Sequence, residues 1–186
     1  MADSQHSAVA NADLHEPAGT DTADAGQIFV FRTSSSAEWQ DVHYSSMRPE
    51  SLAAPAHKTL TAPTAYTALG MVGFEENEQS GSLVGGQGPS LTWDDSFPII
   101  AQVSWNVCLQ HTDASAQSVF ATLMKNGVAL TNYELEENQG SALHLQFSDT
   151  VMLLLEFGDV LTIAVKAAAG DLTIHNAYIS AWGVKE

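Results

Sequence analysis

The sequence has few cations and a single cysteine. Among its 186 residues, 6 Lys and Arg stand against 22 Asp and Glu, which gives a formal net charge of −16. This balance argues against binding to nucleic acid or to an anionic membrane, because both need Lys and Arg to neutralise phosphate. Cys108 is the only cysteine, so an internal disulfide framework and a cysteine-based zinc site are excluded.

Long hydrophobic runs are also missing. No stretch approaches the roughly eighteen consecutive apolar residues that a membrane-spanning helix needs. Residues 1–17 have neither the basic region nor the apolar region of a secretory signal. We therefore expect a protein that is made in a cytoplasm. Its length suits one domain with an appendage, large enough to bury a core without a metal or a disulfide.

The two parts of the chain differ in amino-acid composition and pattern. Residues 1–64 are rich in small and polar residues, and their best apolar run is Ile-Phe-Val-Phe at residues 28–31. That run predicts one short strand, which cannot bury itself. We expect residues 1–64 to form an extended arm that orders against a partner. A plain flexible leader is the alternative.

Residues 65–186 show the period-two pattern of strands. Trp105, Val107 and Leu109 alternate with polar residues, which predicts a half-buried strand. The apolar run at residues 151–155 predicts a strand that is covered on both faces or lies at a subunit contact. No long helical segment is evident. The series of short strands separated by turn signals predicts an all-β, antiparallel sandwich or jelly roll.

Three stretches between these strands carry turn or loop signals. Asn126-Gly127 stands between two apolar runs, which predicts a tight hairpin because both residues tolerate a positive φ. Phe157-Gly158-Asp159 predicts a turn. The glycine-rich stretch at residues 81–88 lacks the ending of a phosphate-binding loop, and we expect a simple loop there.

Motifs that carry chemistry are not evident. The seven histidines form neither an H-x-x-x-H nor an H-E-x-x-H spacing, which argues against a zinc hydrolase. Carboxylates gather at residues 75–78, 94–95 and 134–137, where solvated turn residues are favoured over the acid pair of a glycosidase. No calcium-loop string is present. We therefore assign no catalytic, cofactor-binding or metal-ligating residue and expect a protein that is not an enzyme.

Two sets of ring-bearing residues remain open to interpretation. His144 and His175 lie on predicted strands as polar residues of a wet face. As a second hypothesis, they meet across a trimer interface as a pH-sensitive cluster. Trp93, Trp105 and Trp182 could form a platform for sugars, although packing in a core or an interface is the commoner use of tryptophan.

Three motifs in one order resemble the C1q/TNF-like jelly-roll family. They are FATLMKNG at residues 120–127, LEFGDVLTIAV at residues 155–165 and AYISAWG at residues 177–183. In that family a KNG hairpin, an L-x-x-G-D turn and a final aromatic-glycine strand recur in the same order. The resemblance covers roughly residues 90–186. It implies a jelly-roll sandwich that assembles as a compact homotrimer.

The arm carries a second resemblance. LHEPAG at residues 14–19, followed by ADAGQIFV at residues 23–30, is similar to a leader in tailed-phage capsid decoration proteins and head fibres. Ala18 departs from that leader, in which a lysine often stands. Together the two resemblances imply a structural virion protein on the outer capsid surface. Its arm would bind the major capsid protein, and its jelly roll would project.

These interpretations assign residues to roles. The capsid-anchoring residues are Leu14, His15, Pro17, Gly19, Ile28, Phe29 and Phe31. The residues for trimer or core packing are chosen from strand alternation and are Trp105, Phe120, Leu153, Leu155, Tyr178 and Trp182. The alternative function is a carbohydrate- or receptor-binding jelly-roll module, either a fibre tip or a C1q-like lectin, with a host-surface glycan as its partner.

Overall fold

The structure is a computed structural model that describes residues 27–33, 36–49, 58–71, 74–80, 82–86, 88–139 and 143–185. The chain divides into two compact units, Met1–Val42 and His43–Glu186. The expected boundary between residues 64 and 65 stays a prediction. Four of the expected anchoring residues, Leu14, His15, Pro17 and Gly19, lie outside the described residues.

The described part of the first unit contains one antiparallel strand pair. Strand β1 (Gln27–Thr33) pairs with the beginning of β2 (Ser36–Pro49), from Ser36 to Asp41. The strand predicted at residues 28–31 is therefore present. It contains Ile28, Phe29 and Phe31 and finds its partner in the next segment of the same chain.

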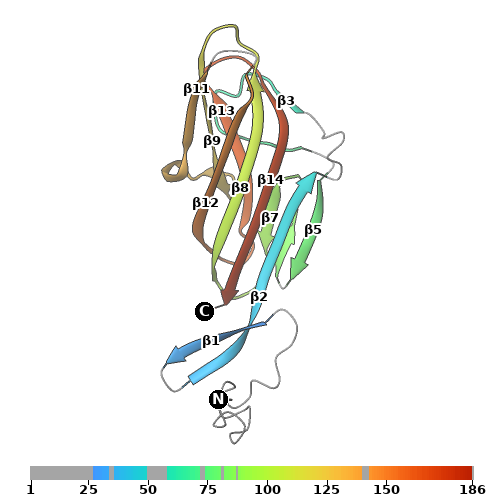
Figure 1. Ribbon diagram of the computed structural model, residues 1–186, viewed down its shortest axis with the longest axis vertical. Helices are drawn as coiled ribbons and strands as arrows, with labels where there is room; N and C mark the ends of the chain where they lie inside the picture. Colours follow the sequence, from blue (N-terminus) through green and yellow to red (C-terminus); the bar gives the residue numbers. More distant parts are fainter. Residues whose placement is uncertain are drawn as a thin grey trace, which may run out of the picture. The chain divides into compact units, whose positions relative to one another are not determined.

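The second unit contains two antiparallel sheets (Figure 1). Sheet I, as we call the first, runs in the order β5 (Phe74–Ser80), β2, β14 (Leu172–Lys185), β8 (Ile99–His111) and β12 (Leu145–Leu155), with β3 (Lys58–Leu60) also paired to β14. Sheet II contains β6 (Leu83–Gly85), β7 (Ser90–Trp93), β13 (Val160–Ala167), β9 (Gln117–Lys125) and β10 (Val128–Ala129) in that order. Two further strands join its sides: β11 (Leu135–Gln139) pairs with β9, and β4 (Thr67–Ala68) with β13.

The order of these strands is that of a jelly roll. Along the chain, β7 lies in sheet II, β8 in sheet I, β9 and β11 in sheet II, β12 in sheet I, β13 in sheet II and β14 in sheet I. Strands far apart in sequence therefore become neighbours, as β8 and β14 do. The one helical element among the described residues is a single 3₁₀ turn, Thr131–Tyr133. The predicted all-β, antiparallel jelly-roll sandwich is confirmed.

The core lies between the two sheets and follows from strict alternation. Along β8, every second residue from Ile99 to His111 is buried, and the residues between them are more exposed. The apolar run at residues 151–155 follows the same rule, because Val151, Leu153 and Leu155 are buried while Met152 and Leu154 are exposed. Within the chain, a strand covered on both faces is therefore wrong, and the alternative, a strand at a subunit contact, stays a prediction. Period two holds even where the sequence itself does not alternate.

The predicted turns are present at both glycine signals. Asn126 and Gly127 take positive φ values of 53° and 78°, and Val128 pairs with Lys125 across this two-residue hairpin. Gly158, with a φ of 80°, forms the turn between β12 and β13. The stretch at residues 81–88, expected as a loop, instead contains β6, because Leu83 is fully buried and pairs opposite Trp93.

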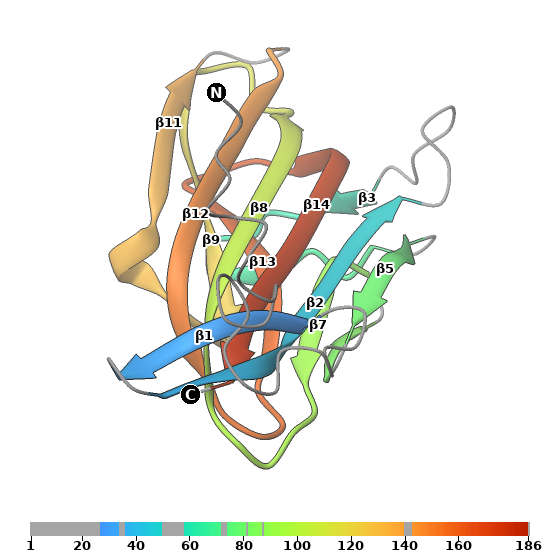
Figure 2. The same ribbon diagram turned by 60° about the horizontal axis from the view of Figure 1, so that its bottom comes forward.

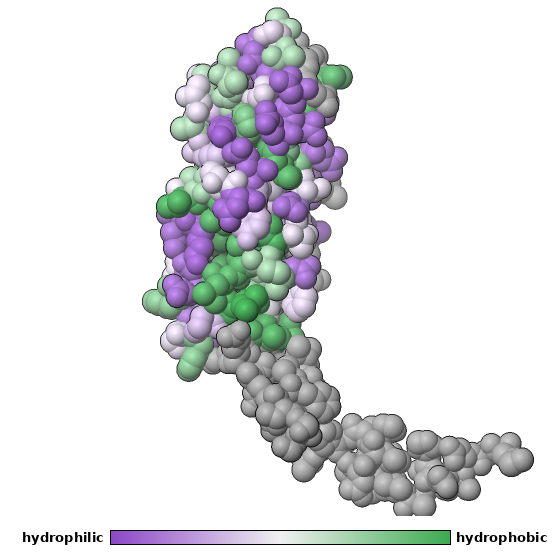
Figure 3. Space-filling view, turned by 90° about the vertical axis from the view of Figure 1, so that its left-hand side faces the viewer, coloured by the Kyte–Doolittle hydropathy of each residue, from purple (hydrophilic) through white to green (hydrophobic). Residues whose placement is uncertain are grey.

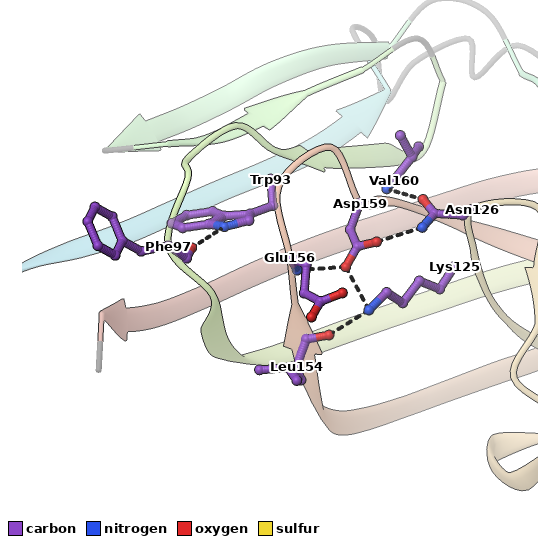
Figure 4. A network of polar contacts seen from close by, with 8 residues as sticks. All are labelled: Trp93, Phe97, Lys125, Asn126, Leu154, Glu156, Asp159 and Val160. Carbon is purple, nitrogen blue, oxygen red and sulfur yellow. Dashed lines mark hydrogen bonds and ion pairs between the residues drawn. The ribbon is translucent and has the colours of Figure 1, made fainter.

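The β9–β10 hairpin and the β12–β13 turn are joined by a network around Asp159 (Figure 4). The Asp159 carboxylate accepts hydrogen bonds from the Asn126 side-chain amide at 2.6 Å and from the Glu156 backbone N–H at 2.7 Å. The backbone N–H of Gly158 donates to the carbonyl oxygen of Trp93 at 2.9 Å. In Figure 2 the β7–β8 and β12–β13 connections lie side by side at one end of the sandwich.

None of the helical segments in the described part of the chain has the length and hydrophobicity that crossing a membrane requires.

Candidate functional site

The outer face of sheet I is built from rows of side chains that cross β14, β8 and β12. Strand pairing places Val184, Ile100 and Leu154 in one row, and Trp182, Gln102 and Met152 in the next. The following rows are Ser180, Ser104 and Thr150; then Tyr178, Asn106 and Ser148; then Asn176, Cys108 and Gln146. The face therefore changes from apolar to polar along the strands.

The first two rows, which we call the apolar rows, expose large hydrophobic side chains. Met152 is 57% exposed, Leu154 52%, Trp182 46% and Ile100 43%. The side of the sandwich formed by β11 and β12 also shows hydrophobic residues gathered toward one end (Figure 3). Single exposed apolar residues are ordinary on a protein surface, whereas four large ones on adjacent rows indicate a contact surface.

The next two rows carry hydroxyl and amide groups around a hollow of about 510 Å³. The Ser104 hydroxyl lies 2.9 Å from the Thr150 hydroxyl, and together they form one hydrogen bond on the floor of the sheet. Tyr178 contributes an aromatic ring with a hydroxyl group to the lining. The hollow is therefore polar on every strand that borders it.

Beyond these rows, two histidine rings and the cysteine lie close together. The ring centroids of His144 and His175 are 4.5 Å apart, and Cys108 Sγ lies 3.9 Å from His144 Nδ1. A register shift in β14 between Ile174 and Asn176 interrupts the alternation at His175. Burial raises the pKa of the Cys108 thiol. The two histidines thus meet within one chain, and the hypothesis of a cluster between copies remains a prediction.

The six residues chosen for trimer or core packing divide among three places. Trp105, Leu153 and Leu155 belong to the buried core. Tyr178 and Trp182 lie on the outer face of sheet I, two rows apart. Ile100, Met152 and Leu154 share that face. Sequence reasoning missed Ile100 and included Met152 and Leu154 only as part of the apolar run at residues 151–155. Their signal was present, since apolar residues at both odd and even positions of a strand indicate two apolar faces.

Phe120, the sixth of these residues, lies on sheet II under a lysine. Lys166 Nζ is 4.3 Å from the centre of the Phe120 ring and 4.4 Å from that of Tyr66. The same ammonium lies 3.0 Å from Glu134 Oε2, which also accepts a hydrogen bond from the Tyr66 hydroxyl. The hydrogen bonds from Tyr66 and Lys166 lower the pKa of the Glu134 carboxyl. This cluster joins the segment before β4 to sheet II.

The tryptophans do not form a common platform. Trp93 is completely buried and Trp105 is 2% exposed, whereas Trp182 stands on the outer face of sheet I. Trp93 donates its indole N–H to the Phe97 carbonyl oxygen at 2.8 Å. Two of the three rings are thus core residues, as the commoner use of tryptophan suggested.

The carboxylates serve local structure where the structure describes them. Asp95 accepts hydrogen bonds from Ser82 and from the Phe97 backbone, and Glu134 pairs with Lys166. The side chains at residues 75–78 lie outside the described ones. Among the residues that the structure describes, no group of three or more His, Cys, Asp or Glu side chains could hold a metal ion.

Comparison with known proteins finds similar solved structures but no similar family model or curated sequence. No protein-family model matches the chain, and no curated protein matches it. The Eiger TNF structure from S. frugiperda is 13% identical with a TM-score of 0.47, over 77% of this chain and 92% of that one. The vertex protein of PRD1 is also 13% identical with a TM-score of 0.47, over 77% of this chain and 96% of that one. The globular domain of zebrafish complement 1qA is 11% identical with a TM-score of 0.46, over 75% and 94% of the two chains.

The likeness is one of fold alone. The strand order described above is what establishes the jelly roll.

Proposed function

We propose that this chain is a non-enzymatic structural protein that decorates the outer surface of a tailed-phage capsid. In this proposal the N-terminal segment binds the major capsid protein, and the jelly roll projects as a homotrimer. The observation that carries the proposal is the pair of apolar rows on sheet I, exposed in a protein with a formal net charge of −16. Large apolar side chains that are exposed on adjacent rows mark an interaction surface.

Self-association gives the apolar rows a function. Burial of apolar surface stabilises a complex by roughly 25 cal/mol per Å² before the costs of association are subtracted. The side chains of Ile100, Met152, Leu154 and Trp182 supply such surface on a regular sheet, which can meet the same surface of other copies. The charge outside the contact would then keep assembled particles apart in solution.

A trimer would also strengthen the attachment of its N-terminal segments. Three segments held in one assembly act at a high effective concentration, so that three weak contacts become one strong attachment. Two observations support the anchoring role: Met1–Val42 forms a compact unit of its own, and residues 14–19 resemble a phage leader. The residues proposed for this contact are Leu14, His15, Pro17, Gly19, Ile28, Phe29 and Phe31.

Co-sedimentation with expanded capsids that lack this protein tests the proposal. The full chain is compared with a chain that begins at His43, because a start at Ala65 would remove β3, whose Leu60 belongs to the core. We expect the full chain to pellet with the shells and the shortened chain to stay in solution. If the full chain stays in solution with intact shells, the capsid proposal is wrong.

A matched pair of variants distinguishes specific anchoring from non-specific adsorption through exposed apolar residues. The double variant Leu14→Ser with Phe29→Ser should lose co-sedimentation, since both changes fall in the segment proposed as the anchor. Leu143→Ser is the control, because Leu143 is 55% exposed and lies in the sandwich unit. Equal loss in both variants would contradict a specific anchor.

A further inference from the structure

A second exposed apolar surface lies at one end of the sandwich, beyond the ends of the strands. Phe97 is 52% exposed in the β7–β8 connection, and Phe157 is 68% exposed in the β12–β13 turn. The backbone of Trp93 joins these two segments, because its N–H donates to the Asp159 carbonyl oxygen and its carbonyl oxygen accepts from the Gly158 N–H, each at 2.9 Å. The two phenylalanines therefore belong to the same end of the sandwich, and we call them the apolar tip.

The local structure at this end does not use the phenylalanine rings. In the β7–β8 connection, the Trp93 indole N–H donates to the carbonyl oxygen of Phe97 at 2.8 Å (Figure 4), and the Asp95 carboxylate accepts from the Phe97 backbone N–H at 3.4 Å. In the β12–β13 turn, Gly158 supplies the positive φ of 80°. Turns are usually built from small or polar residues. Two exposed aromatic rings in adjoining connections therefore indicate a contact surface.

The chain enters the sandwich at the same end. His43 is the first residue of the sandwich unit, and its ring lies edge-on against Trp93 with the centroids 4.8 Å apart. The Nδ1 atom of His43 accepts a hydrogen bond from the Ser82 backbone N–H at 2.9 Å. Because Trp93 also holds the Phe97 backbone, residues 1–42 are attached next to the apolar tip. A partner bound by those residues is thus presented to the tip at a high effective concentration.

The charge around the apolar tip is negative. The β7–β8 connection and the β12–β13 turn together contain four carboxylates and no lysine or arginine. Lys125 neutralises Asp159 at 2.6 Å, whereas Asp94 and Glu156 are exposed beside the two phenylalanines. An apolar centre with a charged rim is the usual composition of a protein-binding surface. Its complement is an apolar patch that is bordered by lysine or arginine.

From these observations we infer that the apolar tip is a second contact with the protein that the N-terminal segment binds. In the proposed function this partner is the major capsid protein, and the inference rests on that function. A cyclic trimer holds its three tips at one level, so that all three can meet one shell. Phe97 and Phe157 lie in connections beyond the strands, and their contact leaves the apolar rows of sheet I for contacts between copies.

Binding isotherms of the full chain on expanded capsids that lack this protein test the inference. In Phe97→Ser with Phe157→Ser, the tip variant, the dissociation constant should rise about tenfold or more, because aromatic anchors carry much of the free energy of a contact. At saturating concentration the N-terminal segment should still hold this variant on the shell. Leu143→Ser is the matched control, since Leu143 is 55% exposed and precedes β12, whereas the tip follows that strand.

The acidic rim has a test of its own in the same assay. Asp94→Asn with Glu156→Gln should bind shells with a weaker dependence on sodium chloride concentration than the unmodified chain, because salt screens attraction between exposed charges. An unchanged salt dependence would contradict a partner surface bordered by lysine or arginine.

Failure of the inference and failure of the capsid proposal give different results. If the unmodified chain stays in solution with intact shells, the capsid proposal fails, and the inference fails with it. If the unmodified chain and the tip variant bind shells with equal affinity, the inference alone is wrong. Thermal unfolding shows whether the tip variant is folded. Should it unfold, Phe157→Ser replaces it, and unchanged affinity in that variant also overturns the inference.

Other occupants of the apolar tip are separated by three measurements on the full chain. A lower mass of the tip variant in sedimentation velocity would assign the tip to contacts between copies. Binding to phosphatidylcholine vesicles that the tip variant loses would assign it to lipid. The unmodified chain should bind more of the neutral apolar dye Nile red than the tip variant does, and equal dye binding would show that the chain itself covers the tip. Each of these three assignments would overturn the inference.

Discussion

The ammonium group of Lys125 lies 2.6 Å from the carboxylate of Asp159, and this ion pair joins the β9–β10 hairpin to the β12–β13 turn. Lys125 also donates a hydrogen bond to the Leu154 carbonyl oxygen at 2.8 Å. The Asp159 side chain is 7% exposed. Two glycine-containing turns that are over thirty residues apart in the sequence are thus held together by one shielded carboxylate.

The first prediction concerns the acid stability of this network. Burial by itself would raise the pKa of Asp159, but hydrogen bonds from Glu156, Lys125 and Asn126, with the charge of Lys125, lower it below its ordinary value of 3.8. A lowered pKa in the folded state stabilises the fold above the unfolded value, and this stability is lost as the pH falls through the folded value. Urea unfolding between neutral and strongly acidic pH should show that loss.

Asp159→Asn should remove part of this pH dependence. At neutral pH we expect this variant to be less stable by about 1–3 kcal/mol, because hydrogen bonds to a charged, shielded group are lost. Asp94→Asn is the control, since Asp94 is exposed. The role given to this carboxylate would be contradicted if Asp159→Asn had the same free energy of unfolding as the unmodified chain and the same loss of stability at acidic pH.

The second prediction concerns the cluster on sheet II. Burial raises the pKa of Tyr66 well above its ordinary value of 10.0, and the hydrogen bond to Glu134 and its charge raise it further. Glu134→Gln should therefore lower the Tyr66 pKa but leave it above the ordinary value. Phenolate absorbance, read as the difference from Tyr66→Phe, measures this change. Glu137→Gln, at an exposed position of β11 three residues after Glu134, should have no effect.

The third prediction compares two glycines with similar backbones. Gly88 and Gly127 both have a positive φ, at 71° and 78°. A methyl group on Gly88 would lie 2.7 Å from the Met71 carbonyl oxygen, whereas one on Gly127 would meet nothing within 4 Å. Both alanine variants bear similar backbone strain, and Gly88→Ala should be less stable than Gly127→Ala by about 1–3 kcal/mol. Equal midpoint temperatures of thermal unfolding for the two variants would contradict this prediction, because they would show that the backbone around Gly88 moves to accommodate the methyl group at little cost.

The fourth prediction concerns the apolar rows. Met152→Ser with Leu154→Ser should weaken self-association in sedimentation velocity without lowering thermal stability much, because both side chains point away from the core. Val128→Ser is the control, since Val128 is 67% exposed at the β9–β10 hairpin and off this face. An unchanged distribution of masses in the double variant would exclude these rows as the contact.

Local patterns in the sequence predict the jelly roll well because its strands and turns carry their own signals. The alternation around Trp105 and the Asn126-Gly127 pair each specify a structure within a few residues. The prediction of a loop at residues 81–88 was wrong because it also relied on local signals alone. Its glycines indicate a loop, but the pairing of Leu83 opposite Trp93 is a tertiary contact that no local pattern contains.

The candidate site was less accessible to sequence reasoning. Its rows bring together residues from β14, β8 and β12, so that Tyr178, Asn106 and Ser148 become neighbours only through strand register. The meeting of His144 and His175 likewise depends on the register shift in β14. Single polar residues on a wet strand face carry no sign of their partners. Register decides which side chains share a row, and it is set by the whole sandwich.

The mass of the full chain in solution, measured by sedimentation equilibrium over a wide range of protein concentration, tests the central claim most directly. The account predicts an assembly three times the mass of one chain, which Met152→Ser with Leu154→Ser shifts toward the single chain. A protein that remains a single chain at every concentration, with its apolar rows exposed, would contradict it.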